Sequence, residues 1–322
     1  MNQIYFSIVI PTYNGSKIIE ETLSALCNQK GTDHIYEIIP VDNNSTDNTR
    51  DIIKNFSQQT TIPINYTFEE RPGSANARNT GFKAARGEII GLIDDDIIVN
   101  DNWVREILKP YSDPEVGAVG GKILLKWING TPPNWFKPYE GWLGKLDFGI
   151  DTLELISGQH INAGNYSIRR DTLFKVGGYP PCDAPGDKLV GDGECGLNQK
   201  VYSIGQKIIW TPDAVGLHVN DASTITLSYM LHRAKQHGKG NAYTFYRNHS
   251  KNLLQIAKYL FIKSIAITKN VIQIIRYYNS RNRKYYDSLF DYKNKLWSIF
   301  YLLTILIDSK LRKLVQNNNW LN

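Results

Sequence analysis

The chain of 322 residues carries 37 basic and 31 acidic side chains, a formal net charge of +6, and 42% of its residues are hydrophobic. A chain of this length and hydrophobicity can bury a large core, which excludes intrinsic disorder. Three cysteines without a regular spacing argue against a disulfide scaffold and favour a reducing compartment. No apolar run reaches the ~18–20 residues of a membrane-spanning helix. The apolar residues 4–10 lack the basic flank of a secretory signal.

Charge and turn residues divide the chain near residue 222. Residues 1–222 hold 20 basic and 28 acidic side chains, a net charge of −8, whereas residues 223–322 hold 17 basic and three acidic ones, a net charge of +14. The last proline is Pro212, and only two glycines follow residue 222. The sequence therefore predicts an acidic, turn-rich domain over 1–222 and a basic, aromatic α-helical extension over 223–322.

The first 125 residues alternate short apolar runs with segments of helical periodicity. The apolar runs predict strands near residues 6–10, 38–41, 64–69 and 88–93. Between them, apolar side chains recur at helical spacing over residues 17–28, 47–56 and 74–86. This alternation predicts an α/β fold with a mostly parallel sheet flanked by helices. Residues 126–160, which carry three tryptophans and two adjacent prolines, are predicted to be an insertion.

Polar side chains follow three of the predicted strands at the point where each strand ends. The clusters are Thr12-Tyr13-Asn14, Asp42-Asn43-Asn44 and Asp94-Asp95-Asp96. In parallel sheets, ligands bind beyond the carboxyl ends of the strands, so the three clusters are expected to share one site. Three adjacent carboxylates repel one another unless a cation neutralises them, and Mg²⁺ or Mn²⁺ often bridges carboxylates to substrate phosphates. An isolated run of aspartates is typical of a solvated turn, but the position after a buried strand favours a metal site.

Several motifs resemble, in order and spacing, those of the family 2 glycosyltransferases. They are SIVIPTYN (7–14), VDNNSTD (41–47), ARNTG (77–81), LIDDD (92–96), NAGN (162–165), RR (169–170), VGGY (176–179) and GDGE (191–194). His218 and a weaker echo over 233–238 extend the resemblance to roughly residues 5–240. Each motif is loose by itself, but the ordered set is specific. The resemblance implies the fold called GT-A.

The resemblance also implies a donor site for a nucleoside-diphosphate sugar. It assigns Asp42 to reading the base and Asp94 to the ribose, while Arg78 either faces phosphate or caps the sheet. The predicted nucleotide-sugar-binding residues are Pro11, Thr12, Tyr13, Asn14, Asp42, Asn44, Arg78, Asp94 and Asp95. Asp96 is implied as the ligand of a divalent cation, Mn²⁺ or Mg²⁺. His218 is a second metal ligand or, as single histidines often are, a structural residue.

The GDGE motif is expected to supply the catalytic base. A sugar hydroxyl is a poor nucleophile, and a carboxylate within ~2.6–3.2 Å can accept its proton as it attacks the anomeric carbon. Direct displacement of this kind inverts the anomeric centre. The resemblance favours Asp192 as the base. Relatives often carry two adjacent acidic residues here, so the departure in this sequence leaves Glu194 as the second candidate.

The acceptor site is predicted from aromatic residues and one polar motif. Trp135 and Trp142 in the insertion present flat apolar faces suited to sugar rings or lipid, and Asn165 is added from the NAGN motif. The alternative is that the tryptophans form a small core beneath a long loop.

The basic extension is predicted to bind an anionic membrane surface. Residues 251–278 are apolar and helix-compatible, with basic side chains on one side of the helix, and residues 296–307 form an apolar stretch too short to span a bilayer. Anionic lipid attracts nearby basic residues by ~1 kcal/mol each. We therefore expect a cytoplasmic protein, peripheral on the inner face of the plasma membrane. Alternatively, the helices pack on the catalytic part or on a second copy, which forms a homo-oligomer.

Taken together, the sequence predicts an inverting, metal-dependent glycosyltransferase with a saccharide or lipid-linked acceptor, in bacterial surface-polysaccharide or glycolipid assembly. Two alternatives remain, a catalytically inactive nucleotide-sugar-binding partner subunit and a nucleotidyltransferase of related fold. Nucleotidyltransferases and hydride-transfer enzymes need a glycine-rich loop after the first strand, and the segment Asn14-Gly15-Ser16 has too few glycines for it. The acidic 1–222 part argues against nucleic-acid binding.

Overall fold

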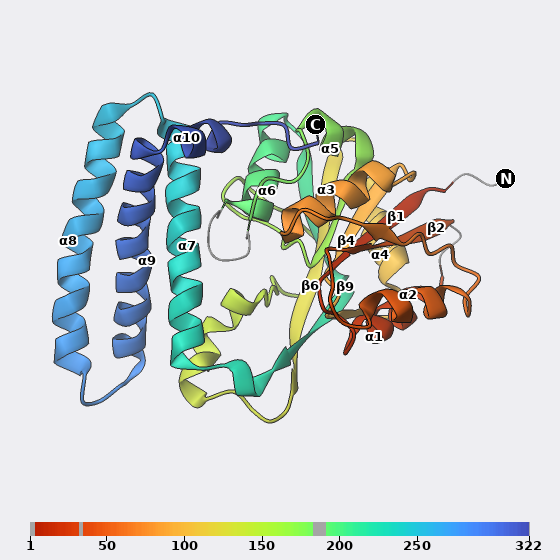
Figure 1. The fold of residues 1–322 in the computed structure, drawn as a ribbon, viewed down its shortest axis with the longest axis horizontal. Helices are drawn as coiled ribbons and strands as arrows, with labels where there is room; N and C mark the ends of the chain where they lie inside the picture. The colour runs from red at the N-terminus through yellow and green to blue at the C-terminus, as the bar shows by residue number, and fades with distance from the viewer. Residues whose placement is uncertain (1–3, 32–34, 183–190, 322) are drawn as a thin grey trace.

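The computed structural model describes residues 4–31, 35–182 and 191–321. A central β-sheet with helices on both faces forms the body, and a group of long helices stands at one side of it (Figure 1). Among the described residues, no helix has the length and apolar character needed to cross a membrane.

The sheet has nine strands, and its first half is parallel. The order of the eight strands along the sheet is β3-β2-β1-β4-β8-β6-β9-β5, and β7 pairs with β9. β1 is parallel to both β2 and β4, β2 to β3, and β6 to β9, whereas β8, β5 and β7 run antiparallel to their neighbours. The bounds are β1 Phe6–Thr12, β2 Tyr36–Asp42, β3 Thr67–Phe68, β4 Ile89–Ile93, β5 Ile97–Val99, β6 Val116–Ile128, β7 Leu153–Glu154, β8 Asn165–Arg169 and β9 Lys207–Asp221.

Helices cover both faces of this sheet, which explains why the central strands are apolar at most positions. Ile8 belongs to one core with Leu23 and Trp103, whereas the next residue, Val9, belongs to the opposite core with Phe82. Successive side chains of a strand point to opposite faces, so a strand covered on both sides reads as a continuous apolar run. The body helices are α1 Ile19–Cys27, α2 Thr49–Ser57, α3 Ser74–Ala84, α4 Trp103–Leu108, α5 Arg170–Lys175 and α6 Gly193–Ser203.

The predicted α/β fold is confirmed, with differences in detail. The expected strand at 64–69 is reduced to the two residues of β3. Within residues 126–160, a 3₁₀ helix η2 (Asn134–Leu143) forms, and shorter 3₁₀ turns lie at Lys109–Ser112 and Ala222–Thr224. Strand β5 was not predicted, because it is only three residues long and is held by pairing with the distant β9.

The C-terminal helices form a layer beside the body. They are α7 Leu227–His249, α8 Leu253–Tyr277, α9 Arg283–Ile307 and α10 Ser309–Val315. Helix α9 lies between α7 and the outermost helix α8 (Figure 1). Phe136 and Tyr139 of η2 share a core with Met230 of α7 and Phe290 of α9, which joins this layer to the body. The apolar stretch 296–307 is the second half of α9 and buries Tyr301, Leu302 and Ile305 against its neighbours.

After α10, the chain returns to the body. The backbone amide of Trp320 donates to the carbonyl of Gly177 at 2.7 Å. The ammonium of Lys200 donates to the carbonyl of Asn318 at 2.9 Å. The Leu321 side chain packs beside Gly178. The returning chain therefore adds a contact between the helical layer and the body that is separate from the core around Phe290.

Gly238 permits the close approach of α7 and α9. A Cβ atom at Gly238 would lie 2.2 Å from the Asn294 carbonyl oxygen, and the Ser298 hydroxyl donates to the Gly238 carbonyl at 2.9 Å. Gly238→Ala is therefore expected to lower the free energy of unfolding by about 1–3 kcal/mol, although alanine is the better helix former. Chemical denaturation measures this. Ser228→Ala, at an exposed position of the same helix, is the control, and an equal or higher stability of Gly238→Ala would contradict the close-packing interpretation.

Candidate active site

A cavity of about 310 Å³ lies beyond the carboxyl ends of β1, β2 and β4. Its lining residues are Pro11, Thr12, Tyr13, Asn43, Ser74, Ala77, Arg78, Asp94, Asp95, Asp96 and His218. The structure thus brings together most of the residues predicted for the donor and metal sites. Tyr13 is 62% exposed beside this cavity, so its ring is free to stack on a planar group.

The three aspartates after β4 point to three different partners. Arg78 donates to Asp94 at 2.6 Å, and Thr12 donates to the Asp95 carboxylate. Burial, together with the charge of Asp96, raises the pKa of Asp95 to about 7. The Asp96 carboxylate lies 3.2 Å from Nε2 of His218. Of these three carboxylates, Asp96 is the one that faces an imidazole, whereas Asp94 is paired with an arginine and Asp95 with a threonine hydroxyl.

His218 has the geometry of a metal-ligating histidine. Its Nδ1 lies 2.8 Å from the carbonyl oxygen of Leu143, which can only accept, so Nδ1 carries the proton and Nε2 is directed to Asp96. Burial lowers the pKa of His218, but the hydrogen bond with Asp96 and the charges of Asp96 and Asp94 outweigh it and raise the pKa. Two facing acceptors at this distance are stabilised by a proton or by a cation.

The donor set fits a divalent cation that is shared with a substrate. Among the residues that the structure describes, no group of three or more His, Cys, Asp or Glu side chains is arranged to hold a metal ion. Asp96 and His218 supply one carboxylate oxygen and one imidazole nitrogen, which suit Mn²⁺ or Mg²⁺. Mg²⁺ in particular is often held by one or two carboxylates together with substrate phosphates. These two residues fit such a site, with the remaining ligands coming from a diphosphate and water.

A chain of contacts links Asp94 to the GDGE motif. The Arg78 guanidinium, 8% exposed at its side chain, lies 4.9 Å from the ring centroid of Tyr179. The Tyr179 hydroxyl donates to Glu194 at 3.0 Å. The Asn79 amide exchanges two hydrogen bonds with the Tyr179 backbone, both 2.9 Å long. Helix α3 therefore contacts both Asp94 and Tyr179, and Arg78 acts on the site through these two residues.

Glu194 and Asp192 both line a cavity of about 230 Å³, but Glu194 also lines two further cavities. Glu194 lines the cavity of about 370 Å³ that also contains Asp94, Asp96 and His218. It lines a further cavity of about 830 Å³ that extends to α7 and α8. Glu194 therefore lies between the cavity that contains Asp94, Asp96 and His218 and a second, larger cavity.

The Asp192 carboxylate is turned toward α7. Its Oδ2 atom pairs with Arg247 and accepts from Thr244 at 3.1 Å. Its Oδ1 atom is buried against Gly196, without a hydrogen-bond partner among the described residues. Burial raises the pKa of Asp192, and Arg247 opposes that rise. Residues 183–190, next to this motif, lie outside the described chain.

Three residues predicted to bind the nucleotide do not line the donor cavity. Asp42 is 2% exposed, and its carboxylate accepts from the Ser45 amide at 2.9 Å and from the Tyr66 hydroxyl at 2.9 Å. Asn14 accepts from the Thr46 amide at 2.8 Å and so joins two loops. Asn14 and Asn44 adopt positive φ angles of 54° and 66°, which asparagine tolerates better than most residues.

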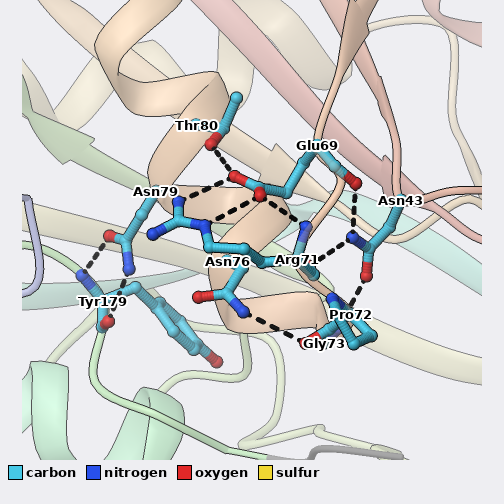
Figure 2. A network of polar contacts seen from close by, with 9 residues as sticks. All are labelled: Asn43, Glu69, Arg71, Pro72, Gly73, Asn76, Asn79, Thr80 and Tyr179. Atoms are coloured by element: carbon cyan, nitrogen blue, oxygen red, sulfur yellow. Dashed lines mark hydrogen bonds and ion pairs between the residues drawn. The ribbon is translucent and has the colours of Figure 1, made fainter.

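Asn43 lines the cavity in place of Asp42, although it was not predicted as a site residue. Its amide donates to the carbonyls of Glu69 and Arg71 at 2.9 and 2.8 Å, and it accepts from the Gly73 amide at 2.7 Å (Figure 2). These bonds hold the loop that leads into α3 and hence position Arg78. The signal in the sequence that could have identified Asn43 was its position in the Asp42-Asn43-Asn44 cluster after the second strand.

Glu69 holds the other side of the same loop (Figure 2). It is 5% exposed and accepts two hydrogen bonds from the Arg71 guanidinium, at 2.9 and 2.8 Å, and another from Thr80. The bonds from Arg71, opposed by burial and supported by Thr80, lower the pKa of Glu69 to about 2.

Glu69 is expected to make the free energy of unfolding depend on pH. A carboxylate with a depressed pKa in the folded state stabilises the fold above its unfolded pKa, near 4.5, and this contribution is lost as pH falls to about 2. Glu69→Gln should lower the free energy of unfolding by on the order of 2 kcal/mol at pH 7. Denaturation curves at several pH values should show the difference from wild type shrinking toward zero at pH 2. The exposed Glu20→Gln is the control, and a difference independent of pH would argue against the charge of Glu69.

The acceptor prediction for Asn165 is corrected by the structure. Asn165 is fully buried; it accepts from Trp103 Nε1 at 2.8 Å and donates to the carbonyls of Lys122 and Ala214 at 3.0 and 2.8 Å. It therefore bridges the core and strands and has no surface to offer an acceptor.

Trp135 and Trp142 pack between the insertion and the C-terminal helices. Trp135 stacks on Tyr286 at a centroid distance of 5.0 Å, and Trp142 stacks on His237 at 4.9 Å. Both belong to the cluster around Phe290. His237 in turn lines the larger cavity. Trp142 therefore contacts a residue of the cavity wall and does not line the cavity itself.

Arg247 and Thr244 were not predicted at all. Both come from α7, about 50 residues after the motif that they contact, and no local pattern marks them. They show that the C-terminal helices contribute side chains directly to the active-site region.

Comparison with known proteins agrees with this arrangement. The model of the family described as glycosyl transferase family 2 matches residues 7–177. Glycosyltransferase AglE of Haloferax volcanii is 26% identical over 215 residues, 66% of each chain. The validoxylamine A glucosyltransferase of Streptomyces hygroscopicus subsp. limoneus is 31% identical over 129 residues, 39% of this chain and 27% of that protein. The chain thus spans about two thirds of AglE and about a quarter of the latter.

Solved structures share the fold. The mannosyltransferase PcManGT of Pyrobaculum calidifontis, solved with GDP-Man and Mn²⁺, superposes with a TM-score of 0.63 at 17% identity, over 94% of this chain and 88% of that one. This likeness identifies the fold as GT-A. Because the family model covers more than half of the chain, the chain belongs to glycosyl transferase family 2.

Proposed function

We propose that this glycosyltransferase moves a sugar from a nucleoside-diphosphate sugar to an acceptor hydroxyl, with inversion at the anomeric carbon. The observation that carries the proposal is the cavity in which Asp94, Asp96 and His218 share one space with Glu194. Asp96 and His218 would hold a divalent cation. Such a cation stabilises the negative charge that grows on the departing diphosphate.

Glu194 is proposed as the base, in preference to Asp192. It borders both the donor side and the larger cavity, whereas the Asp192 carboxylate is neutralised by Arg247. Glu194 accepts the proton of the acceptor hydroxyl as the new oxygen–carbon bond forms and the bond to the diphosphate breaks. The hydrogen bond from Tyr179 orients the carboxylate for this transfer.

The larger cavity is proposed to bind the acceptor. It has a volume of about 830 Å³, and its polar side chains include Asn162, Gln199 and Asn241 alongside the aromatic rings of Phe245 and Tyr259. This mixture suits a saccharide, and the volume suits a polymeric or lipid-linked acceptor of the kind used in bacterial surface-polysaccharide or glycolipid assembly.

A donor screen tests the proposal. Purified chain is incubated with UDP- and GDP-sugars and with saccharide acceptors, with Mn²⁺, Mg²⁺ or EDTA, and release of the nucleoside diphosphate is measured. We expect release that requires both the metal and the acceptor, and a product whose anomeric configuration, determined by NMR, is opposite to that of the donor. Retained configuration, or equal release in EDTA, would contradict it.

A further inference from the structure

Helix α8 exposes a row of large apolar side chains at the outer edge of the molecule. The row consists of Leu254, Phe261, Ile265, Ile272 and Ile275, with exposed fractions of 78, 65, 43, 58 and 72%. Figure 1 shows why they are uncovered: α9 lies on the inner side of α8, and no described element lies on its outer side. A contiguous exposed apolar surface of this kind marks an interaction site.

The row is straight and is bordered by positive charge. Its members are 7, 4, 7 and 3 residues apart, which keeps them on one side of a helix over ~32 Å. A second row within α8 has a spacing of 11 and 7 residues, which aligns its members to within about 20° of one another and about 60° around the helix from the apolar row. This basic row contains Lys258, Lys269 and Arg276, and Lys251 lies in the turn just before α8.

Among the described residues, no acidic side chain forms an ion pair with the basic row. No Asp or Glu occurs between residues 222 and 286. The nearest acidic side chains of α9 are engaged elsewhere: Asp287 accepts from Tyr139 at 2.7 Å, and Asp291 accepts from Asn270 at 3.0 Å and pairs with Lys295. The outer side of α8 therefore presents apolar surface and a single sign of charge, the combination found in helices that lie in a membrane interface.

The opposite side of α8 borders the proposed acceptor cavity. Tyr259 and Lys263 line the cavity of about 830 Å³ that also contains Glu194. At 100° per residue, these two positions are at least about 120° from every member of the apolar row. One helix thus separates the cavity from the exposed row.

We propose that α8 lies along an anionic lipid surface, with the apolar row inserted among the acyl chains and the basic row against the headgroups. Charge decides between lipid and a second copy of the chain. A two-fold symmetric contact over α8 would bring together two identical basic rows, because a symmetric interface places the same patch on both partners. An anionic lipid surface instead attracts every member of the row. The proposal rests on this face alone and not on the reaction.

Flotation of the full chain with vesicles tests the proposal. We expect binding to phosphatidylcholine vesicles containing about one third phosphatidylglycerol, little binding to pure phosphatidylcholine, and release at high salt. Lys258→Gln/Lys269→Gln should weaken binding by about 25-fold, since each lysine near the surface contributes about fivefold. Phe261→Ser/Ile272→Ser should weaken it by at least about tenfold.

Matched control variants distinguish binding through this surface from nonspecific adsorption to vesicles. Lys83→Gln removes an exposed charge of the body, and Ile150→Ser removes an apolar side chain that is 86% exposed; neither should alter binding. Thermal unfolding of all variants should match wild type, since the changed side chains are exposed. Equal binding of wild type and both α8 double variants would overturn the proposal. So would absence of vesicle binding together with a dimer, detected by light scattering, that Phe261→Ser/Ile272→Ser dissociates.

Discussion

Glu194→Gln is expected to lower kcat for sugar transfer by about 10²–10⁴-fold, the contribution typical of a positioned general base. The amide keeps the size of the side chain and its bond to Tyr179, but it cannot accept a proton. Donor affinity should change little, because Glu194 lies at the boundary of the donor side and not among the groups around Asp96. Steady-state kinetics with saturating donor and acceptor measures both quantities.

Two comparisons decide whether the loss belongs to the base. In Glu194→Ala, added formate should restore part of kcat, because a small carboxylate can occupy the vacated space, whereas Glu88→Gln, at an exposed position of the body, should behave as wild type. Asp192→Asn should mainly lower stability, because it removes the negative charge that faces the half-buried Arg247 and leaves it the hydrogen bond to Gln199. If folded Asp192→Asn loses kcat as severely as Glu194→Gln and formate rescues only Asp192→Ala, the base is Asp192.

Asp96→Ala is expected to abolish metal-stimulated turnover, with a loss of about 10²–10³-fold in kcat. The Asp96 carboxylate is the oxygen ligand that lies beside Nε2 of His218 in the proposed site, whereas Asp94 in the same cavity is paired with Arg78. His218→Ala should raise the concentration of Mn²⁺ needed for half-maximal rate by about 10–100-fold, with a smaller effect on kcat once metal is saturating. Metal titrations of initial rates distinguish these two outcomes.

Direct binding supplies a readout besides turnover. Mn²⁺ binding in the presence of the nucleoside diphosphate, followed by paramagnetic resonance, should weaken in both variants. Asp101→Ala is the matched control, since Asp101 is exposed, five residues further on, and pairs only with Lys30 among described residues. Undiminished Mn²⁺ binding by Asp96→Ala would remove Asp96 from the metal site.

The clusters at the ends of β1, β2 and β4 could be predicted because each is a local pattern. A buried strand is an apolar run, and its abrupt change to Asp94-Asp95-Asp96 marks the point where the chain leaves the core. The pattern does not say which member of a cluster faces the ligand. The orientation at Asp42 and Asn43 depends on Tyr66 and on the carbonyls of a later loop.

The features that were missed depend on contacts between distant residues. Arg247 meets Asp192 only because α7 packs beside α6, and neither helix shows this in its own sequence. Asn165 is a polar residue in a glycine-containing motif, which is typical of a binding loop, yet its amide joins Trp103 to the backbone of two strands inside the core. The tryptophans of residues 126–160 could not be assigned to acceptor or core without the position of Phe290.

The return of the chain to Gly177 after α10 has a mechanical consequence. The core around Phe290 and the ion pair of Arg247 with Asp192 already hold the helical layer against the body. The bonds of Trp320 and Asn318 hold it at a further place, which opposes rotation of the layer relative to the body. The interval between the outer side of α8 and Glu194 is then constant. On a lipid surface, the enzyme would act as a ruler: it would glycosylate only hydroxyls that stand at one height above the bilayer, and a growing glycan would pass out of reach once it had been extended past that height.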